Sequence, residues 1–428
     1  MLRTTGLILI LYFLSLTQVI CGQDIDYTRQ VIKKLTSTEF GGRGYANEED
    51  KVAANYIEHE YDSLGLSYFG KGYLQAFPIS VNTFPSVVQF SANGRVLKTG
   101  EDYHVDPGSP SIAGTYKTLY LRPNELLNTK ILEGRLRKSK GRFIVLEEFD
   151  PSFYSVEQIR KIESNRQLIM YGPDIPAIGV IELTSNKLTW FASVRQFERP
   201  VIRLRISSLE TEIEVVELDI EARFLSEYTT HNVIGYIEGE KSDSIILISA
   251  HYDHLGMMGK EVIFPGANDN ASGVALMLDL ARNYSLVKPP NTIVFIAFSG
   301  EELGLRGSAH FVEHPLFPLS KIKFMLNFDI AGTGDEGIQI VNGSIFTKQF
   351  DLISQINADH QLLPQVRVRG EACNSDHCLF YRKGVPSFFI YTLGGIQAYH
   401  DVYDREDTLP LTNYNAYFEL LVRFIDKL

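Results

Sequence analysis

From Asn232 onward, apolar segments alternate with amphipathic ones, and this alternation is the feature that most restricts the fold of the chain. The apolar segments are, in order, NVIGYIEG, IILISAH, TIVFIAF, KFMLNF and GIQIVN. Helical patterns lie between them, over residues 272–286 and after Leu303. Near-continuous apolar strands that alternate with helices are typical of a sheet whose two faces are both covered. We therefore predict an α/β domain with a mostly parallel or mixed central sheet sandwiched by helices.

The N-terminal residues 1–22 form a separate part of the chain. Arg3 is followed by an apolar run from Gly6 to Leu16 and then by smaller or weakly polar residues. This order is typical of a secretory signal peptide, and the run is too short to span a bilayer. We expect an exported protein, extracellular or periplasmic. Cys21 offers the alternative of a lipid anchor.

Two further parts precede the α/β region. Residues 23–80 carry two amphipathic helical patterns, DYTRQVIKKLTS and NEEDKVAANYIEHEYDSLGL, on either side of the glycine-rich EFGGRGYA. Residues 81–225 change to short alternating or β-branched runs, TLYLR, RFIVLEE, AIGVIEL and VIRLRI, with one helical stretch around SVEQIRKIES. We interpret the second part as an inserted β-rich domain. The main domain would comprise residues 23–80 and 226–428.

Composition excludes some classes of partner. The 428 residues carry 41 Lys and Arg against 52 Asp and Glu, a formal net charge of −11, without a dense basic block. A nucleic-acid partner is therefore not expected. No segment beyond the first resembles a membrane span. The length is sufficient to bury the core of one large domain and a smaller one.

Ionisable side chains follow the ends of the predicted strands. They are, in chain order, His251, Asp253, Asp269, Glu301, Glu302, Asp329 and His400. In α/β sheets, ligands bind outside the strand ends, where loops leave for helices. Each residue alone would also fit a loop histidine, a solvated helix start or a helix cap. Two imidazoles and three carboxylates at strand ends together suit two zinc ions, because zinc takes nitrogen and oxygen ligands and one carboxylate can bridge two ions.

The motifs AHYDHLG, NDNASG, SGEELGLRGS and NFDIAG resemble those of the di-zinc aminopeptidase family, of the aminopeptidase S and aminopeptidase Y type. Its relatives include glutamate carboxypeptidase, the transferrin receptor and glutaminyl cyclase. The resemblance covers most of the chain beyond residue 22 and is strongest from Asn232 to Leu409. It implies a zinc-exopeptidase fold of phosphorylase/hydrolase-like type and a hydrolase that acts on peptides. The β-rich insert resembles the protease-associated domain of several relatives.

The resemblance also implies a complete set of metal ligands. His251 and Asp329 fall on the ligands of one zinc ion, and His400 and Glu302 fall on those of the other. Asp269 falls on the carboxylate that bridges both. Each of these five positions holds the residue type that the family uses, so two Zn²⁺ per chain are expected.

Two further residues, Glu301 and Tyr399, take roles from the resemblance, and Asp253 takes one from its spacing to His251. Glu301 falls on the general base, which accepts the proton of the attacking water and returns it to the leaving amine. Asp253 lies two residues after His251 and would orient its imidazole. Tyr399 falls where some relatives donate to the tetrahedral intermediate, although an aromatic residue packed beside a strand end also fits.

Smaller features stay open. The family often has a cis peptide bond after the bridging aspartate, here Asp269–Asn270. Cys373 and Cys378 could pair in an oxidising compartment, as in some relatives, but two free thiols also fit. A structural role is predicted for the remaining histidines, among them His254, His310, His314 and His377.

Other functions remain to be weighed against an aminopeptidase. A carboxypeptidase or dipeptidase would use the same scaffold. Glutaminyl cyclases share the scaffold but are built around one zinc ion, and receptor-like ectodomains of transferrin-receptor type lose metal ligands. The full set of five ligands favours a peptidase. The preferred substrate side chain, the role of the insert and the oligomeric state are not decided by the sequence.

Overall fold

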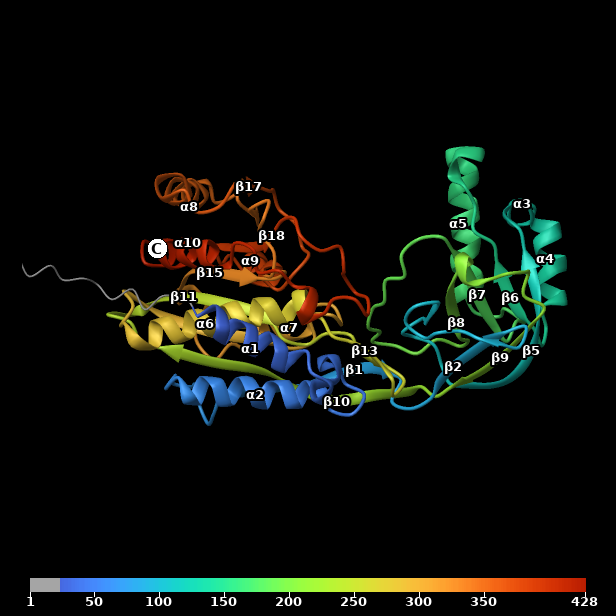
Figure 1. Ribbon diagram of the computed structural model, residues 1–428, viewed down its shortest axis with the longest axis horizontal. Coiled ribbons are helices and arrows are strands. Elements are labelled where there is room, and N and C mark those ends of the chain that lie inside the picture. Colours follow the sequence, from blue (N-terminus) through green and yellow to red (C-terminus); the bar gives the residue numbers. More distant parts are fainter. Residues whose placement is uncertain (1–23) are drawn as a thin grey trace, which may run out of the picture.

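The computed structural model describes residues 24–428, and the predicted signal peptide and the alternative anchor at Cys21 lie outside the described residues. The chain forms two lobes (Figure 1), which the long strands β1 (Leu74–Thr83) and β10 (Arg223–Ile237) connect. Among the described residues, no helix combines the length and apolarity that crossing a membrane requires.

The larger lobe contains an eight-stranded mixed sheet with the order β1-β10-β14-β11-β15-β18-β16-β17. Its remaining strands are β11 (Lys241–His251), β14 (Asn291–Phe298), β15 (Ile322–Phe328), β16 (Ile338–Val341), β17 (Val366–Val368) and β18 (Ser387–Thr392). The central strands β14, β11, β15 and β18 are parallel, whereas β10 and β16 run antiparallel to their neighbours β14 and β18. The predicted mostly parallel or mixed sheet is confirmed.

Helices cover both faces of this sheet. One face packs against α1 (Ile25–Leu35), α2 (Glu49–Ser63), α6 (Gly273–Leu286), α8 (Thr347–His360) and α10 (Tyr414–Ile425), and the other against α7 (Arg306–Glu313) and α9 (His377–Arg382). Successive residues of β11 alternate between the two cores: Ile246 and Ile248 belong to the first, Ile245 and Leu247 to the second. This alternation follows from the period of two in a strand and explains why residues 245–248 of β11 are all apolar.

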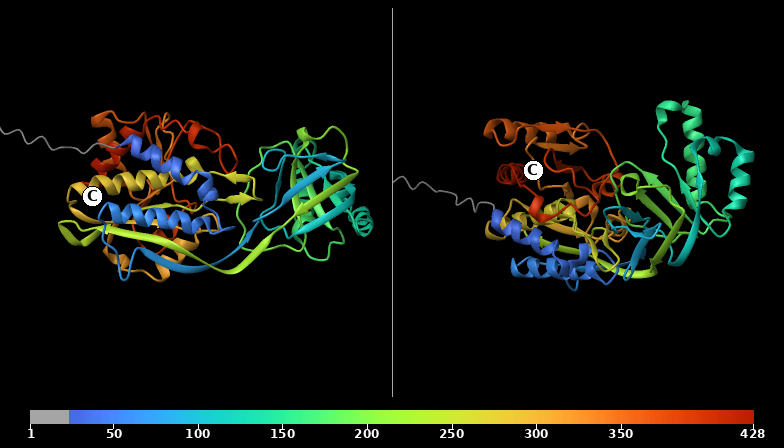
Figure 2. Two further views of the ribbon diagram at one scale, coloured as in Figure 1. Left: turned by 60° about the horizontal axis from the view of Figure 1, so that its bottom comes forward. Right: turned by 45° about the vertical axis from the view of Figure 1, so that its right-hand side comes forward.

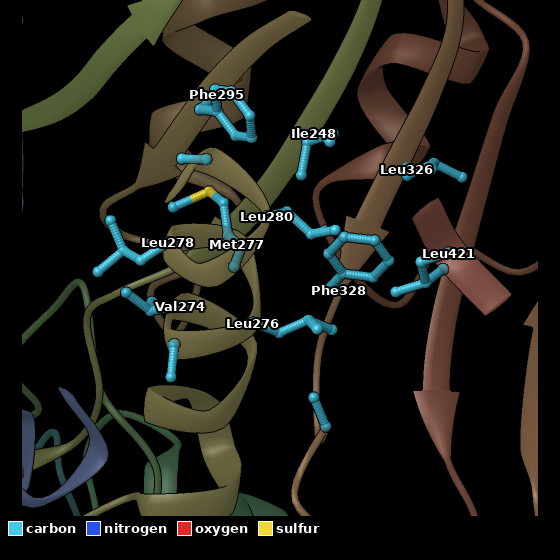
Figure 3. Close-up of a cluster of buried hydrophobic side chains, with 14 of the residues drawn as sticks. Ile248, Val274, Leu276, Met277, Leu278, Leu280, Phe295, Leu326, Phe328 and Leu421 are labelled. Atoms are coloured by element: carbon cyan, nitrogen blue, oxygen red, sulfur yellow. The ribbon is translucent and has the colours of Figure 1, made fainter. Parts of the chain in front are cut away.

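Helix α6 is enclosed by apolar side chains. Phe328 of β15 lies between Leu280 of α6 and Leu421 of α10 (Figure 3), and all three are fully buried. A helix buried on several sides is apolar around its circumference rather than along one stripe. Because α6 begins directly after the turn that carries Asp269, this packing also places that turn relative to the sheet.

The smaller lobe contains a second eight-stranded sheet with the order β3-β2-β9-β5-β6-β7-β8-β4. Its strands are β2 (Val88–Ala92), β3 (Arg95–Val96), β4 (Tyr103–Val105), β5 (Ile112–Leu121), β6 (Phe143–Leu146), β7 (Gly179–Thr184), β8 (Val201–Arg205) and β9 (Val215–Ile220). Helices α3 (Pro123–Leu127), α4 (Thr129–Lys138) and α5 (Val156–Tyr171) pack on one face. The four β runs quoted from the sequence are β5, β6, β7 and β8.

The two lobes share a hydrophobic core. A hairpin of the larger lobe, β12 (Gly256–Met258) and β13 (Val262–Phe264), places Met258 and Phe264 among the buried residues of the smaller sheet. The long strands β1 and β10 pair along their length and run from one lobe to the other (Figure 2, left). The predicted boundaries of the insert, residues 81 and 225, are partners in this ladder. The boundaries and the likeness to a protease-associated domain stay predictions.

Candidate metal centre

The predicted ligands lie at one edge of the larger sheet. His251 is the last residue of β11, Asp329 follows β15 directly, and Glu302 lies just beyond β14. These three strands are parallel neighbours, so their carboxyl ends meet at the same edge. Asp269 precedes α6 at this edge, and its peptide bond to Asn270 is cis, as the resemblance implies.

The first group of donor atoms has the spacing of a zinc site. His251 Nε2 lies 3.4 Å from Asp269 Oδ1 and 3.4 Å from Asp329 Oδ2. Zinc bonds of about 2.0–2.1 Å in a tetrahedral site set the ligand atoms about 3.3–3.4 Å apart. The second carboxylate oxygen of Asp329, Oδ1, is buried without a hydrogen-bond partner among the described residues. The donor types and distances of this group fit zinc.

The second group uses the other oxygen of the same aspartate. His400 Nε2 lies 3.0 Å from Asp269 Oδ2 and 3.4 Å from Glu302 Oε2. Asp269 therefore faces one histidine with each carboxylate oxygen, which is the arrangement of a bridging ligand. The imidazoles of His251 and His400 hold the pKa of Asp269 well below its usual range against the opposing effect of burial.

A main-chain carbonyl orients each of the two histidines. His251 Nδ1 donates to the carbonyl oxygen of Asp253 at 3.1 Å, and His400 Nδ1 donates to that of Trp190 at 2.9 Å. A donor hydrogen on Nδ1 leaves Nε2 free as a metal ligand. The sequence predicts that the carboxylate of Asp253 orients His251, but the Oδ1 atom is 3.8 Å from Nδ1, so the shorter contact is with the main chain.

The carboxylate of Asp253 instead holds the segment that carries the two adjacent glutamates. It accepts hydrogen bonds from the main-chain N–H groups of Glu301 at 3.1 Å and Glu302 at 3.4 Å. The hydroxyl of Tyr45 also donates to it at 2.9 Å and accepts from the main-chain N–H of Gly300 at 3.1 Å. Burial raises the pKa of Asp253 to about 6, and the Tyr45 and Glu301 hydrogen bonds lower it. Asp253 and Tyr45 thus hold the main chain of the segment that carries Glu301 and Glu302.

The glycine-rich segment EFGGRGYA lies beneath the site. A Cβ atom on Gly44 would come within 2.4 Å of the Cα atom of Gly256, so the close approach of these two segments requires glycine. The contact buries Arg43, whose guanidinium donates to the carbonyl oxygen of Gly266 at 2.8 Å. Burial lowers the pKa of Arg43 to about 10, and the charges of Asp269 and Asp404 oppose the shift.

Asp404 supports the bridging aspartate from the other side. Its carboxylate accepts from the main-chain N–H groups of Asn268 at 2.8 Å and Asp269 at 3.0 Å. Burial raises the pKa of Asp404 to about 7, although these two hydrogen bonds lower it. Neither Arg43 nor Asp404 is among the residues that the sequence singles out. The nearest signal for Asp404 is the motif QAYHDVYD, in which it is the last residue.

The smaller lobe contributes directly to the site. Its segment between β7 and β8 meets the loop that carries His400 (Figures 1 and 2), where the N–H of Trp190 donates to the carbonyl oxygen of His400 at 2.9 Å. Lys187 forms an ion pair with Asp401 at 2.5 Å and donates to the carbonyl oxygen of Tyr399 at 3.1 Å. The position of one predicted zinc ligand therefore depends on the inserted segment, which the sequence alone does not reveal.

Tyr399 and the same segment border the open side of the site. The ring of Tyr399 stacks on that of His400 with the centroids 4.0 Å apart, and the side chain is 44% exposed. Burial and the nearby carboxylates raise the pKa of its hydroxyl. A cavity of about 320 Å³ lies beside this region, and its apolar lining includes Trp190, Phe191, Ala192, Val194 and Leu303. Glu301 lies next to the predicted ligands, and burial raises its pKa well above the usual value.

Other predicted features are placed as follows. Cys373 and Cys378 form a disulfide at the start of α9. The ring of His310 stacks on that of Phe77, and the ring of His377 stacks on that of Phe389, as expected of residues that serve packing. The sequence predicts a structural role for His254 as well, but the structure places its ring in the metal centre, with Nδ1 2.7 Å from Glu302 Oε1.

Residues 232–425, which contain all five predicted ligands, match the model described as Peptidase family M28.

The chain is similar to the aminopeptidase YwaD of Bacillus subtilis, with 26% identity over 260 residues that cover 58% of this chain and 53% of the relative. A probable zinc metalloprotease of Pyricularia oryzae is 42% identical over 111 residues, 25% of this chain and 22% of the relative. The chain thus spans about half the length of the first relative and less of the second.

Solved structures share the fold across both lobes. A zinc aminopeptidase from Bacillus subtilis superposes with a TM-score of 0.69 at 21% identity and covers 94% of each chain. A peptidase M28 precursor from Shewanella amazonensis gives a TM-score of 0.69 at 18% identity, with 94% of this chain and 92% of the other covered. At these identities the likeness concerns the fold.

Proposed function

We propose that the chain is a zinc-dependent exopeptidase that removes N-terminal residues from peptides with two zinc ions per molecule. The observation that carries this proposal is the geometry of Asp269, whose two carboxylate oxygens face His251 and His400 separately. His251, Asp329 and Asp269 would hold one ion, and His400, Glu302 and Asp269 the other. A site for a single ion would not require a carboxylate between two sets of ligands.

The two ions, when bound, would polarise the scissile carbonyl and lower the pKa of a water molecule toward neutrality. Glu301 then accepts the proton of the attacking water and returns it to the departing amine. Burial raises the pKa of this carboxyl group, and groups with raised or lowered pKa values cluster at functional sites, which supports this role. The Asp253 carboxylate holds the main chain of Glu301, so the base keeps its direction while the proton moves.

The open side of the site supports the binding of a short peptide end. The stacked ring of Tyr399 and the apolar cavity beside Leu303 offer a surface for the first residues of a peptide. Tyr399 is half-exposed there, and we assign its hydroxyl to the developing oxyanion of the tetrahedral intermediate. The similarity to an aminopeptidase and to a probable zinc metalloprotease supports the same class of reaction.

Export of the protein is part of the proposal. The signal-like pattern of residues 1–22 supports it, and the disulfide between Cys373 and Cys378 suits an oxidising compartment. For the insert, we propose the boundaries 81–225 and a protease-associated type of domain. The agreement of both lobes with a solved zinc aminopeptidase supports this assignment.

A panel of chromogenic aminoacyl substrates tests the proposed activity. We expect the purified protein to cleave substrates with a free N-terminus and to leave N-acetylated substrates essentially intact, since an exopeptidase recognises the free amine. A chelator should abolish the cleavage, and added zinc should restore it. Equal rates on free and blocked substrates would contradict the aminopeptidase assignment, and full activity in chelator would contradict the role of zinc.

A further inference from the structure

His254 is a buried histidine whose polar side-chain contacts all involve one partner. The side chain is fully buried, and Nδ1 lies 2.7 Å from Glu302 Oε1. The other ring nitrogen, Nε2, has no hydrogen-bond partner among the described residues. The contact with Glu302 is therefore the one hydrogen bond that this ring forms among the described residues.

The two oxygens of Glu302 have different surroundings. Oε1 faces His254 Nδ1, whereas Oε2 lies 3.4 Å from His400 Nε2, the distance expected between two ligands of one metal ion. The 2.7 Å contact of His254 is a hydrogen-bond length and is shorter than the about 3.3–3.4 Å that separates two ligand atoms of a tetrahedral zinc ion. Although His254, Asp269 and Glu302 lie close enough to hold a metal, the geometry favours a hydrogen bond.

The main chain restricts the ring of His254 to this position. A Cβ atom on Gly266, which has a φ angle of +58°, would lie 2.4 Å from the ring atom Cδ2 and 2.6 Å from Cγ. The rings of His254 and His400 meet edge to face with their centroids 5.7 Å apart. The main chain at Gly266 and the imidazole of His400 thus hold the ring of His254 against Glu302.

We propose that His254 is a positioning residue for the metal centre. Its Nδ1–H donates to Oε1 of Glu302 and thereby directs Oε2, and only Oε2, toward the metal that His400 and Asp269 also bind. This inference rests on the proposed zinc function. A carboxylate without this hydrogen bond could rotate or bind through both oxygens, so the second metal position would lose affinity and the first would keep it.

Two substitutions separate this role from a structural one. In His254→Asn the amide nitrogen occupies the place of Nδ1 and can still donate to Glu302, whereas His254→Leu keeps apolar bulk without a donor. We expect His254→Leu to weaken the binding of one of two zinc ions by about 10–100-fold, the usual cost of losing an outer partner of a ligand. His254→Asn should recover most of this affinity. Competition with a chromogenic zinc chelator measures both affinities on the full-length protein without using activity.

His104→Leu is the matched control, because His104 is also a buried histidine but lies in β4 of the smaller lobe. It should lower the thermal unfolding temperature without changing zinc affinity. Equal zinc loss in the Asn and Leu variants would overturn the inference and indicate that the imidazole itself is a ligand. Unchanged zinc affinity in His254→Leu would also overturn it. A wild-type protein that binds no zinc would instead refute the proposed function, which keeps the two failures distinguishable.

Discussion

Replacing Glu301 by Gln is expected to lower kcat by about 10²–10⁴-fold, the usual contribution of a general base, while the zinc content stays unchanged. The amide has nearly the shape of the carboxylate but cannot take a proton from water. Its main-chain N–H would still donate to Asp253, so the local backbone should be preserved. Steady-state kinetics with an aminoacyl substrate and elemental analysis of the same sample measure both quantities.

The neighbouring glutamate supplies the control for this result. Glu302→Gln removes charge from a predicted ligand, so it should reduce zinc content as well as activity. The two variants should therefore differ in zinc content: Glu301→Gln should retain its zinc, and Glu302→Gln should contain less. Near wild-type activity in Glu301→Gln would refute its role as the base.

Removal of the bridging carboxylate should have the largest effect on metal content. In Asp269→Ala both oxygens that face His251 and His400 are lost, so we expect both zinc ions to dissociate and activity to disappear. The loss should exceed the about 10–100-fold decrease in affinity that follows from removing an outer partner. Elemental analysis after dialysis measures the zinc content.

Asp279→Ala offers a comparison for Asp269→Ala within the same helical region. Asp279 is also a buried aspartate, but its carboxylate accepts from the hydroxyl of Tyr414 at 3.1 Å and lies in α6. This variant should lose folding stability and keep its zinc. If Asp269→Ala retained both ions, the bridging role would be refuted.

Much of the larger lobe could be predicted from sequence because its signals are local. Strand β14 is buried at every position, and α6 follows the polar segment Ala267–Ser272, so the apolar runs locate both elements. The ligands could be predicted because they follow these runs directly. Parallel neighbours then bring residues from distant parts of the sequence to one edge without any knowledge of the loops.

The smaller lobe was harder to predict because its elements are short and weakly patterned. Helix α5 begins with a capping box formed by Ser155 and Gln158, and the sequence predicts it. Helix α4 has a single buried residue, Leu132, and several basic side chains, so its pattern does not differ from that of a solvated turn. The contacts between Trp190 and His400 are not predictable from either segment alone, because they involve main-chain atoms of residues far apart in the sequence.

The contacts of the residues that support the metal centre are likewise not predictable from the sequence. Tyr45 and Arg43 lie in a loop before the first strand, yet they contact Asp253 and the turn before α6. His254 directly follows Asp253 in the motif AHYDHLG, but only the structure shows that its ring faces Glu302. Spacing in the sequence identifies side chains that share a strand end. The partner of each side chain depends on tertiary contacts.

The most direct test of the two-zinc account is a titration of metal-free, full-length protein with zinc, in which bound metal and hydrolysis of a free aminoacyl substrate are measured together. We predict that full activity is reached at two bound zinc ions per chain. Full activity at one bound ion, or activity that does not depend on bound zinc, would contradict the bridging role of Asp269 and the function built on it.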